Sequence, residues 1–138
     1  MGEPRRSVHV AGFDHANPVP AACRIGPFVF SGAITGRDPR TREMPADLDT
    51  QCANLFRHVR AIAEAAGGST DDIAKMTFWL RDLHDRDALN REWTAMFPDR
   101  DNRPARHAVA ATFDGATLIQ GDFIAVLSAG GMPSEPRP

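Results

Sequence analysis

The sequence has few cysteines and no long apolar run. Cys23 and Cys52 are its two cysteines, and neither belongs to a C-x-x-C pair or has a histidine at metal-binding spacing. A disulfide framework and a zinc site are therefore not expected, and both thiols are predicted to be reduced. No apolar run approaches the roughly 20 residues that cross a bilayer, and residues 1–6 lack the apolar stretch of a signal peptide. These absences predict a cytoplasmic protein without a membrane segment.

The sequence also lacks an excess of charge of one sign and the common cofactor motifs. Sixteen Lys and Arg against eighteen Asp and Glu give a net charge of -2, and the positive residues are scattered, which argues against a nucleic-acid partner. No phosphate-binding, dinucleotide-binding, zinc-protease or serine-hydrolase motif is present, so no cofactor and no metal are predicted. The 138 residues, 42% of them hydrophobic, fit one globular domain.

Two helices are predicted from apolar residues spaced three and four positions apart. The first has its cap at Asp47 or Asp49 and ends at Gly67-Gly68. The second opens at 85–87 and is stopped by Pro98. In this second helix the spacing makes Trp93 a core residue.

Short runs of β-branched and aromatic residues predict the strands. They lie at 8–11, 28–32, 73–80, 106–113 and 118–127. Asp114-Gly115 is a strong hairpin signal and predicts that the last two strands pair directly. The element order predicts an α+β protein in which an antiparallel or mixed sheet carries two helices on one face.

An arginine at the start of the strand near residue 106 is the first candidate for chemistry. Pro104 presets the backbone before Arg106, and loops gather at such sheet ends. A planar guanidinium offers paired donors that match both oxygens of a carboxylate. The same pattern also fits an arginine that pairs with an aspartate of its own or of a neighbouring subunit. Strand alternation predicts that Ala108 shares the face of Arg106, whereas His107 points to the opposite face.

Four segments together carry a resemblance to a known family. They are 25–32, with the sequence IGPFVFSG; 38–43, DPRTRE; 65–75, AAGGSTDDIAK; and 103–106, RPAR. The chain resembles the reactive intermediate deaminases, the YjgF/RidA-type imine and enamine deaminases, over residues 17–127. Residues 1–16 form an N-terminal segment with a candidate edge strand, and residues 128–138 are predicted to be a flexible tail.

This resemblance implies a chorismate-mutase-like fold in a barrel-like homotrimer with three clefts between subunits. In each cleft Arg106 would clamp the carboxylate of a 2-imino or 2-enamino acid, and a positioned water would release ammonia and a 2-oxo acid. The implied partners are therefore a small imino or 2-oxo acid and further copies of the chain, with no nucleic acid and no membrane.

The sequence departs from the family pattern at two places. The usual Gly-Pro-Tyr corresponds here to residues 17–19, Asn-Pro-Val, and the chain has no tyrosine. Gln120 stands where the family has a water-orienting glutamate, and an amide binds water but takes no proton from it. Asp122 could replace the acid or form a structural pair.

The resemblance and the strand pattern together define a set of candidate site residues. Arg106 and Gln120 are the catalytic candidates. The substrate-binding candidates are Val19, Phe30, Ser31, Gly32 and Ala108, and the secondary ones are Asp122 and His107. Two other functions stay open: a non-catalytic, carboxylate-binding or regulatory trimer, and a hydrolase for a ring-derived enamine. The substrate side chain and any protein partner are left undetermined.

Overall fold

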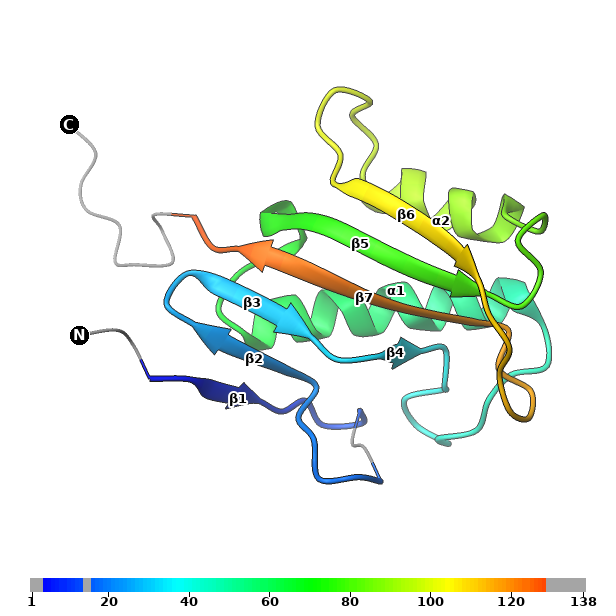
Figure 1. Cartoon of the computed structure of the whole chain (residues 1–138), viewed down its shortest axis with the longest axis horizontal. Coiled ribbons are helices and arrows are strands. Elements are labelled where there is room, and N and C mark those ends of the chain that lie inside the picture. The colour runs from blue at the N-terminus through cyan, green and yellow to red at the C-terminus, as the bar shows by residue number, and fades with distance from the viewer. Residues whose placement is uncertain (1–3, 14–15, 129–138) are drawn as a thin grey trace.

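The computed structural model describes residues 4–13 and 16–128, and it places one mixed sheet in front of two helices (Figure 1). The strands are β1 (Arg6–Val8), β2 (Ala22–Ile25), β3 (Phe28–Ser31), β4 (Ile34–Thr35), β5 (Ile73–Leu80), β6 (Ala105–Ala110) and β7 (Ile119–Val126). The helices are α1 (Leu48–Ala65) and α2 (Asp87–Met96), with a short 3-10 turn at Thr70–Asp72. The predicted tail falls mostly on residues outside this description.

The sheet follows the order β1-β2-β3-β7-β5-β6, and β4 extends it by pairing with β7. Among the described strands, only β5 and β6 run parallel, because α2 carries the chain back between them. All other pairs are antiparallel. The predicted α+β class, with a mixed sheet and two helices on one face, is confirmed.

Helix α1 begins and ends where the sequence signals place it. The Asp47 carboxylate caps it by accepting the backbone N–H of Thr50 at 2.8 Å, so Asp47 rather than Asp49 is the cap. After the last turn Gly67 takes a positive φ of 99°, which favours glycine. There the Arg24 guanidinium donates to the Ala66 carbonyl at 2.9 Å, so the end of α1 is tied to β2.

The predicted hairpin between the last two strands is wrong. β6 pairs with β5, and β7 also pairs with β5 on its other edge, so β5 separates the two strands. Asp114-Gly115 does form a turn, with Gly115 at φ 64°, but it lies inside the longer loop 111–118. The edge strand is observed at 6–8 rather than 8–11, and the short strands β2 and β4 were not predicted.

Two side chains hold loop 111–118 in place through main-chain contacts. Gln51, fully buried on α1, donates to the carbonyls of Pro45 and Ala116 and accepts the N–H of Leu118. The Arg81 guanidinium donates to the carbonyls of residues 113, 115 and 117. The loop that leads into β7 is therefore fixed to α1 and to the end of β5.

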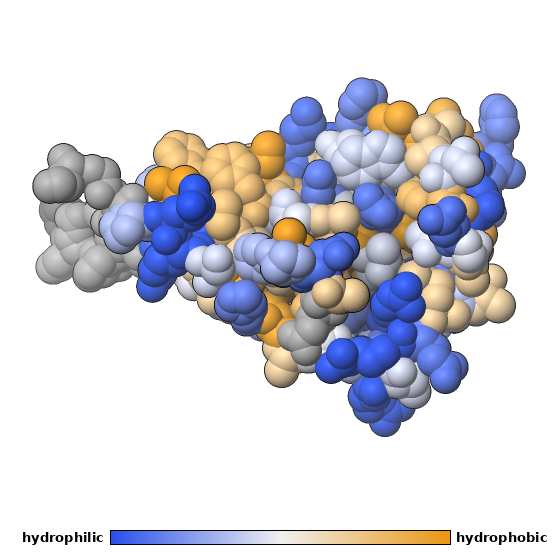
Figure 2. All heavy atoms as spheres, turned by 60° about the horizontal axis from the view of Figure 1, so that its bottom comes forward, coloured by the Kyte–Doolittle hydropathy of each residue, from blue (hydrophilic) through white to orange (hydrophobic). Residues whose placement is uncertain are grey.

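The sheet has two different faces. On the helix face, Met76 and Phe78 of β5 and Phe123 of β7 are buried against the helices. On the opposite side, here called the open face, no helix of residues 4–13 and 16–128 covers the sheet (Figure 1). The large apolar side chains of this face are 38–47% exposed; they are Ile25, Phe28, Phe30, Ile124 and Val126. Figure 2 shows hydrophobic side chains gathered at the left of the molecule, where Figure 1 places the β2–β3 hairpin.

The two cysteines form no disulfide with each other. Cys23 and Cys52 are free thiols, and burial raises the pKa of the Cys52 thiol to about 12, so this thiol stays protonated. Within residues 4–13 and 16–128, no helix combines the length and the apolar character needed to cross a membrane.

Candidate functional site

Arg106 lies on β6, at the edge of the described sheet, and it faces the helices. Its register partner on β5 is the buried Met76, and its guanidinium carbon lies 5.1 Å from the centre of the Trp93 ring on α2. The burial of Trp93 confirms that it is a core residue. The aromatic ring supports the guanidinium from one side and leaves its N–H groups available.

The charge of Arg106 is not neutralised within the described part of the chain. Its side chain forms no hydrogen bond and no ion pair there. Burial lowers the pKa of Arg106, and the nearby positive charge of Arg86 lowers it further. A half-buried cation without a counter-ion is costly, so this position favours an anionic ligand. Ala108 shares this face two residues further along the strand and is partly buried.

Gln120, Asp122 and His107 lie on the open face. They belong to two neighbouring rows of side chains that run across the strands. Gln120 stands between Thr35 of β4 and Trp79 of β5. Asp122 is opposite Thr77 of β5, and Thr77 is in turn beside His107 of β6. His107 therefore faces away from Arg106, as strand alternation predicts.

Three candidates from two strands, Phe30 and Ser31 of β3 and Asp122 of β7, meet around one hollow of the open face. This hollow, of about 270 Å³, is lined by Phe30, Ser31, Lys75, Thr77, Asp122, Phe123 and Ile124. Burial raises the pKa of the Asp122 carboxyl, although the charge of Lys75 and a backbone hydrogen bond at Thr77 oppose the rise. Asp122 thus lies beside Lys75 and Phe30 around this hollow, and it forms no ion pair with the described residues.

Ser31 and Gly32 stand at an irregularity between β3 and β4. The three residues 31–33 face two residues of β7, because Phe30 pairs with Ile124 and Ile34 pairs with Gly121. The Ser31 hydroxyl accepts the N–H of Phe123 at 2.8 Å and donates to the Gly32 carbonyl at 2.9 Å. The Gly32 N–H donates to the carbonyl of Ala21. The backbone here is fixed by local bonds.

Val19 lies in the loop before β2 and is 50% exposed. Its N–H donates to the Asn17 carbonyl at 2.7 Å, which forms a tight turn. With half of its surface exposed, Val19 is not buried against either face of the sheet. As one wall of a pocket, Val19 would need a surface from outside this chain.

The two catalytic candidates do not meet within one chain. Arg106 faces the helices, whereas Gln120 shares the open face with Trp79 and Val109. Since side chains on opposite faces of a sheet are separated by the backbone layer, one molecule of substrate cannot contact both residues of the same chain. A site that uses both must take them from different copies.

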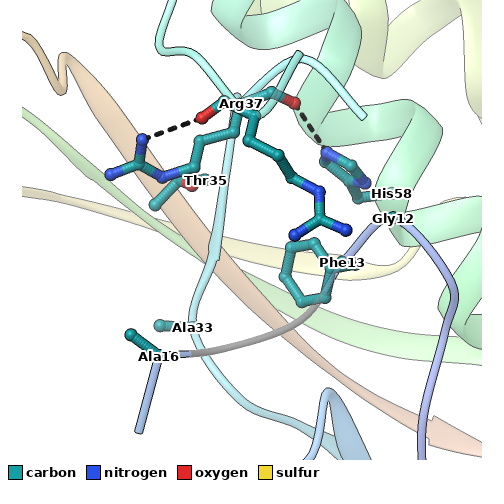
Figure 3. A pocket seen from close by; sticks show the side chains of 8 residues that line it. Gly12, Phe13, Ala16, Ala33, Thr35, Arg37 and His58 are labelled. Atoms are coloured by element: carbon teal, nitrogen blue, oxygen red, sulfur yellow. Dashed lines mark hydrogen bonds between the residues drawn. The ribbon is translucent and has the colours of Figure 1, made fainter. Parts of the chain in front are cut away.

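A second cavity contains none of the predicted site residues. It has a volume of about 480 Å³ and lies between the N-terminal loop, β4 and α1 (Figure 3). His58 Nε2 donates to the Arg37 carbonyl at 2.8 Å, and the Phe13 ring lies 4.8 Å from the imidazole. Burial lowers the pKa of His58, so the imidazole is neutral and structural. The apolar stripe of α1 indicates that His58 is buried, but nothing in the sequence indicates a cavity beside it.

A metal site was not expected from the sequence. Among the residues that the structure describes, no three His, Cys, Asp or Glu side chains come close enough together to hold an ion. The predicted positions present the Arg106 guanidinium, the Gln120 amide, the Asp122 carboxyl and the backbone near Ser31, and Lys75 and Thr77 line the same hollow as Asp122.

Within the described residues, these features define an α+β protein with a half-buried arginine without a counter-ion at one sheet edge and with one sheet face that no helix covers. The family model described as endoribonuclease L-PSP matches residues 12–114. A RutC family protein of Haemophilus influenzae is 37% identical over 107 residues, which cover 69% of this chain and 80% of that protein. The chain therefore belongs to the endoribonuclease L-PSP family, the family of the YjgF/RidA proteins.

Relatives with assigned chemistry and solved structures are similar to this chain. The 2-iminobutanoate/2-iminopropanoate deaminase of Escherichia coli K12 is 37% identical over 86 residues, 62% of this chain and 67% of that enzyme. The crystal structure of E. coli TdcF with bound serine has a TM-score of 0.81 at 28% identity and covers 89% of this chain and 99% of that one. The E. coli YjgF structure has a TM-score of 0.79 at 27% identity, over 88% and 98% of the two chains.

Proposed function

We propose that the protein hydrolyses 2-imino and 2-enamino acids to 2-oxo acids and ammonia, in a cleft between copies of the chain. The observation that carries this proposal is the half-buried Arg106, which rests on Trp93 and has no counter-ion among the described residues. Such a guanidinium binds a carboxylate through two parallel N–H donors. The deaminase chemistry is that of the similar E. coli enzyme.

The proposed reaction needs little more than orientation. An imine protonated on nitrogen is electrophilic at carbon, and a water held near that carbon adds to it. The resulting carbinolamine loses ammonia and leaves the 2-oxo acid, so that one water is consumed for each ammonia released. Gln120 would hold the water through its amide, since it takes no proton at neutral pH. Fixing carboxylate and water together raises their effective concentration.

We also propose that three copies form a chorismate-mutase-like, barrel-like homotrimer in which the open faces cover one another. The apolar residues of the open face, 38–47% exposed in the single chain, support this arrangement, because soluble proteins rarely leave such a patch uncovered. A second chain would also bring a Gln120 or a Val19 to the Arg106 of its neighbour. The trimer would therefore complete the site.

Replacing Phe28 on the open face by aspartate is expected to dissociate the trimer. Phe28 is 47% exposed in the single chain, so the monomer tolerates the carboxylate, whereas burying three charges at an interface opposes assembly. Light scattering after size exclusion should give three times the 15.0 kDa chain mass for wild type and one chain mass for Phe28→Asp. Thr94→Asp, on the exposed side of α2, is the matched control. A monomeric wild type would contradict the proposal.

The deaminase activity is tested with imines made in place by an L-amino acid oxidase from alanine or leucine, with semicarbazide present to trap imine that survives. We expect wild type to lower the yield of semicarbazone at least tenfold relative to buffer and to speed the release of ammonia. Hydrogen peroxide formation, which reports the oxidase alone, should stay unchanged. Equal trapping with and without the protein, for small, branched and aromatic imines, would reject the deaminase proposal.

A second candidate is a non-catalytic trimer that binds small carboxylates. The amide of Gln120, in place of an acid that could accept a proton, is the observation that favours it. Calorimetric binding of a 2-oxo acid together with no acceleration of imine loss would support this candidate over the enzyme.

A further inference from the structure

We propose that Arg86 is a second cationic contact next to Arg106, and that it directs the site toward imino acids that carry a second carboxylate. This inference rests on the proposed function, and it specifies the substrate class. Arg86 lies immediately before α2, at the helix cap, and is exposed.

Arg86 and Trp93 lie on the same side of α2. Seven residues make two turns of an α-helix, so Arg86 and Trp93 lie above one another on the side of α2 where Trp93 contacts Arg106. Trp93 lies under the Arg106 guanidinium at 5.1 Å, and Arg86 is about 10 Å further along the helix axis. The residues that follow Arg106 on the same face of β6 are Ala108 and Ala110, whose small side chains fill little of the space beside α2.

Neither guanidinium is neutralised by the part of the chain that the structure describes. Arg86, like Arg106, has no side-chain hydrogen bond or ion pair with the described residues. The acids that flank it in sequence, Asp85 and Asp87, form no ion pair with it. The positive charge of Arg86 nevertheless acts on Arg106, because it helps to lower the pKa of the Arg106 guanidinium. Two cations that repel each other without a counter-ion form a site that an anion with two charges would stabilise.

The chemistry of the pair selects a class of substrate. A monocarboxylic imino acid on Arg106 leaves Arg86 without an anion, whereas a 2-imino dicarboxylic acid presents its second carboxylate some bonds away from the first. Hydrolysis is the same for both: one water enters, ammonia leaves and a 2-oxo acid remains. Since Arg86 is exposed, its contribution is that of a screened charge, worth about 1 kcal/mol, or roughly a factor of five to ten in kcat/KM.

The experiment compares two imines with three proteins. An L-glutamate oxidase supplies the imine of glutamate, and an L-amino acid oxidase supplies that of leucine. For Arg86→Ala we expect kcat/KM to fall about five- to tenfold for the glutamate imine and to stay within twofold for the leucine imine. The control is Arg91→Ala, which removes the same charge from the same helix; Arg91 pairs with Asp49 at 3.1 Å and is 61% exposed. This control should change neither rate by more than twofold.

The outcomes separate this inference from the proposed function. If wild type hydrolyses the leucine imine and Arg86→Ala loses nothing with the glutamate imine, or loses equally with both, Arg86 is not a specificity residue. If wild type hydrolyses neither imine, the deaminase proposal fails, and calorimetry with 2-oxoglutarate and 4-methyl-2-oxopentanoate decides the inference. If wild type binds 2-oxoglutarate more tightly than 4-methyl-2-oxopentanoate and Arg86→Ala abolishes this difference, the inference stands. If wild type shows no such difference in affinity, the inference is overturned.

Discussion

Arg106→Ala is expected to lower kcat/KM for imine hydrolysis at least a hundredfold. The variant loses two charge-assisted hydrogen bonds to the substrate carboxylate, each worth about 1.5–3 kcal/mol, and about 2.7 kcal/mol already corresponds to a factor of one hundred. Arg106→Lys keeps the charge but not the paired donors, so we expect an intermediate loss. Initial rates of ammonia release from the leucine imine, measured at several imine concentrations, give both values.

A loss of stability must be separated from this loss of activity. Removing Arg106 also removes its contact with Trp93, worth about 0.5–2 kcal/mol, so thermal unfolding should be recorded for each variant. Arg91→Ala serves again as the control for a lost surface charge. If Arg106→Ala unfolds normally and keeps its rate within threefold of wild type, Arg106 does not bind the substrate.

Gly36→Ala is expected to destabilise the fold by about 3 kcal/mol, at the upper end of typical overpacking costs. A Cβ at this position would lie within 2.6 Å of three backbone atoms of Gln51. Helix backbone cannot move aside as a flexible side chain does, so α1 and β4 must separate. The same movement weakens the hydrogen bond from the Asn54 amide to the Gly36 carbonyl, now 3.1 Å long. For a domain of this size the melting temperature should fall by roughly 10 °C.

Gly115→Ala is the matched comparison for this effect. Gly115 has a positive φ of 64°, and its added Cβ would meet no atom within 4 Å. The expected cost is therefore conformational strain alone, about 1–2 kcal/mol. Equal melting temperatures for the two variants would show that the contact between Gly36 and α1 is looser than described.

The elements set by local signals could be predicted from the sequence. The apolar spacing and the cap at Asp47 determine α1, and Pro98 follows the end of α2. The strand at 73–80 has the predicted boundaries, because turn residues bound its apolar run on both sides. Two of these elements lie beside Arg106: α2 supplies Trp93, and β5 supplies its register partner Met76.

The features that depend on strand pairing could not be predicted in the same way. Asp114-Gly115 specifies a turn, but it does not specify that β6 and β7 pair on either side of it, and β5 occupies the position between them. For the same reason the sequence does not show that Arg106 and Gln120 lie on opposite faces. Their relation follows from the register of β5 with both neighbours. Arg86 was missed because no motif marks it, and only the packing of α2 beside β6 brings it near Arg106.

Loop 111–118 is held by contacts to its main chain rather than to its side chains. Gln51 and Arg81 contact only carbonyl and N–H groups of the loop, at residues 113 and 115–118. Every residue type supplies a main-chain carbonyl, so these contacts place almost no demand on the loop's own side chains. Apart from Gly115, whose positive φ favours glycine, the amino acids of this loop can therefore be exchanged for other non-proline residues while its path is kept, which makes it a suitable segment for reshaping the molecular surface without rebuilding the fold.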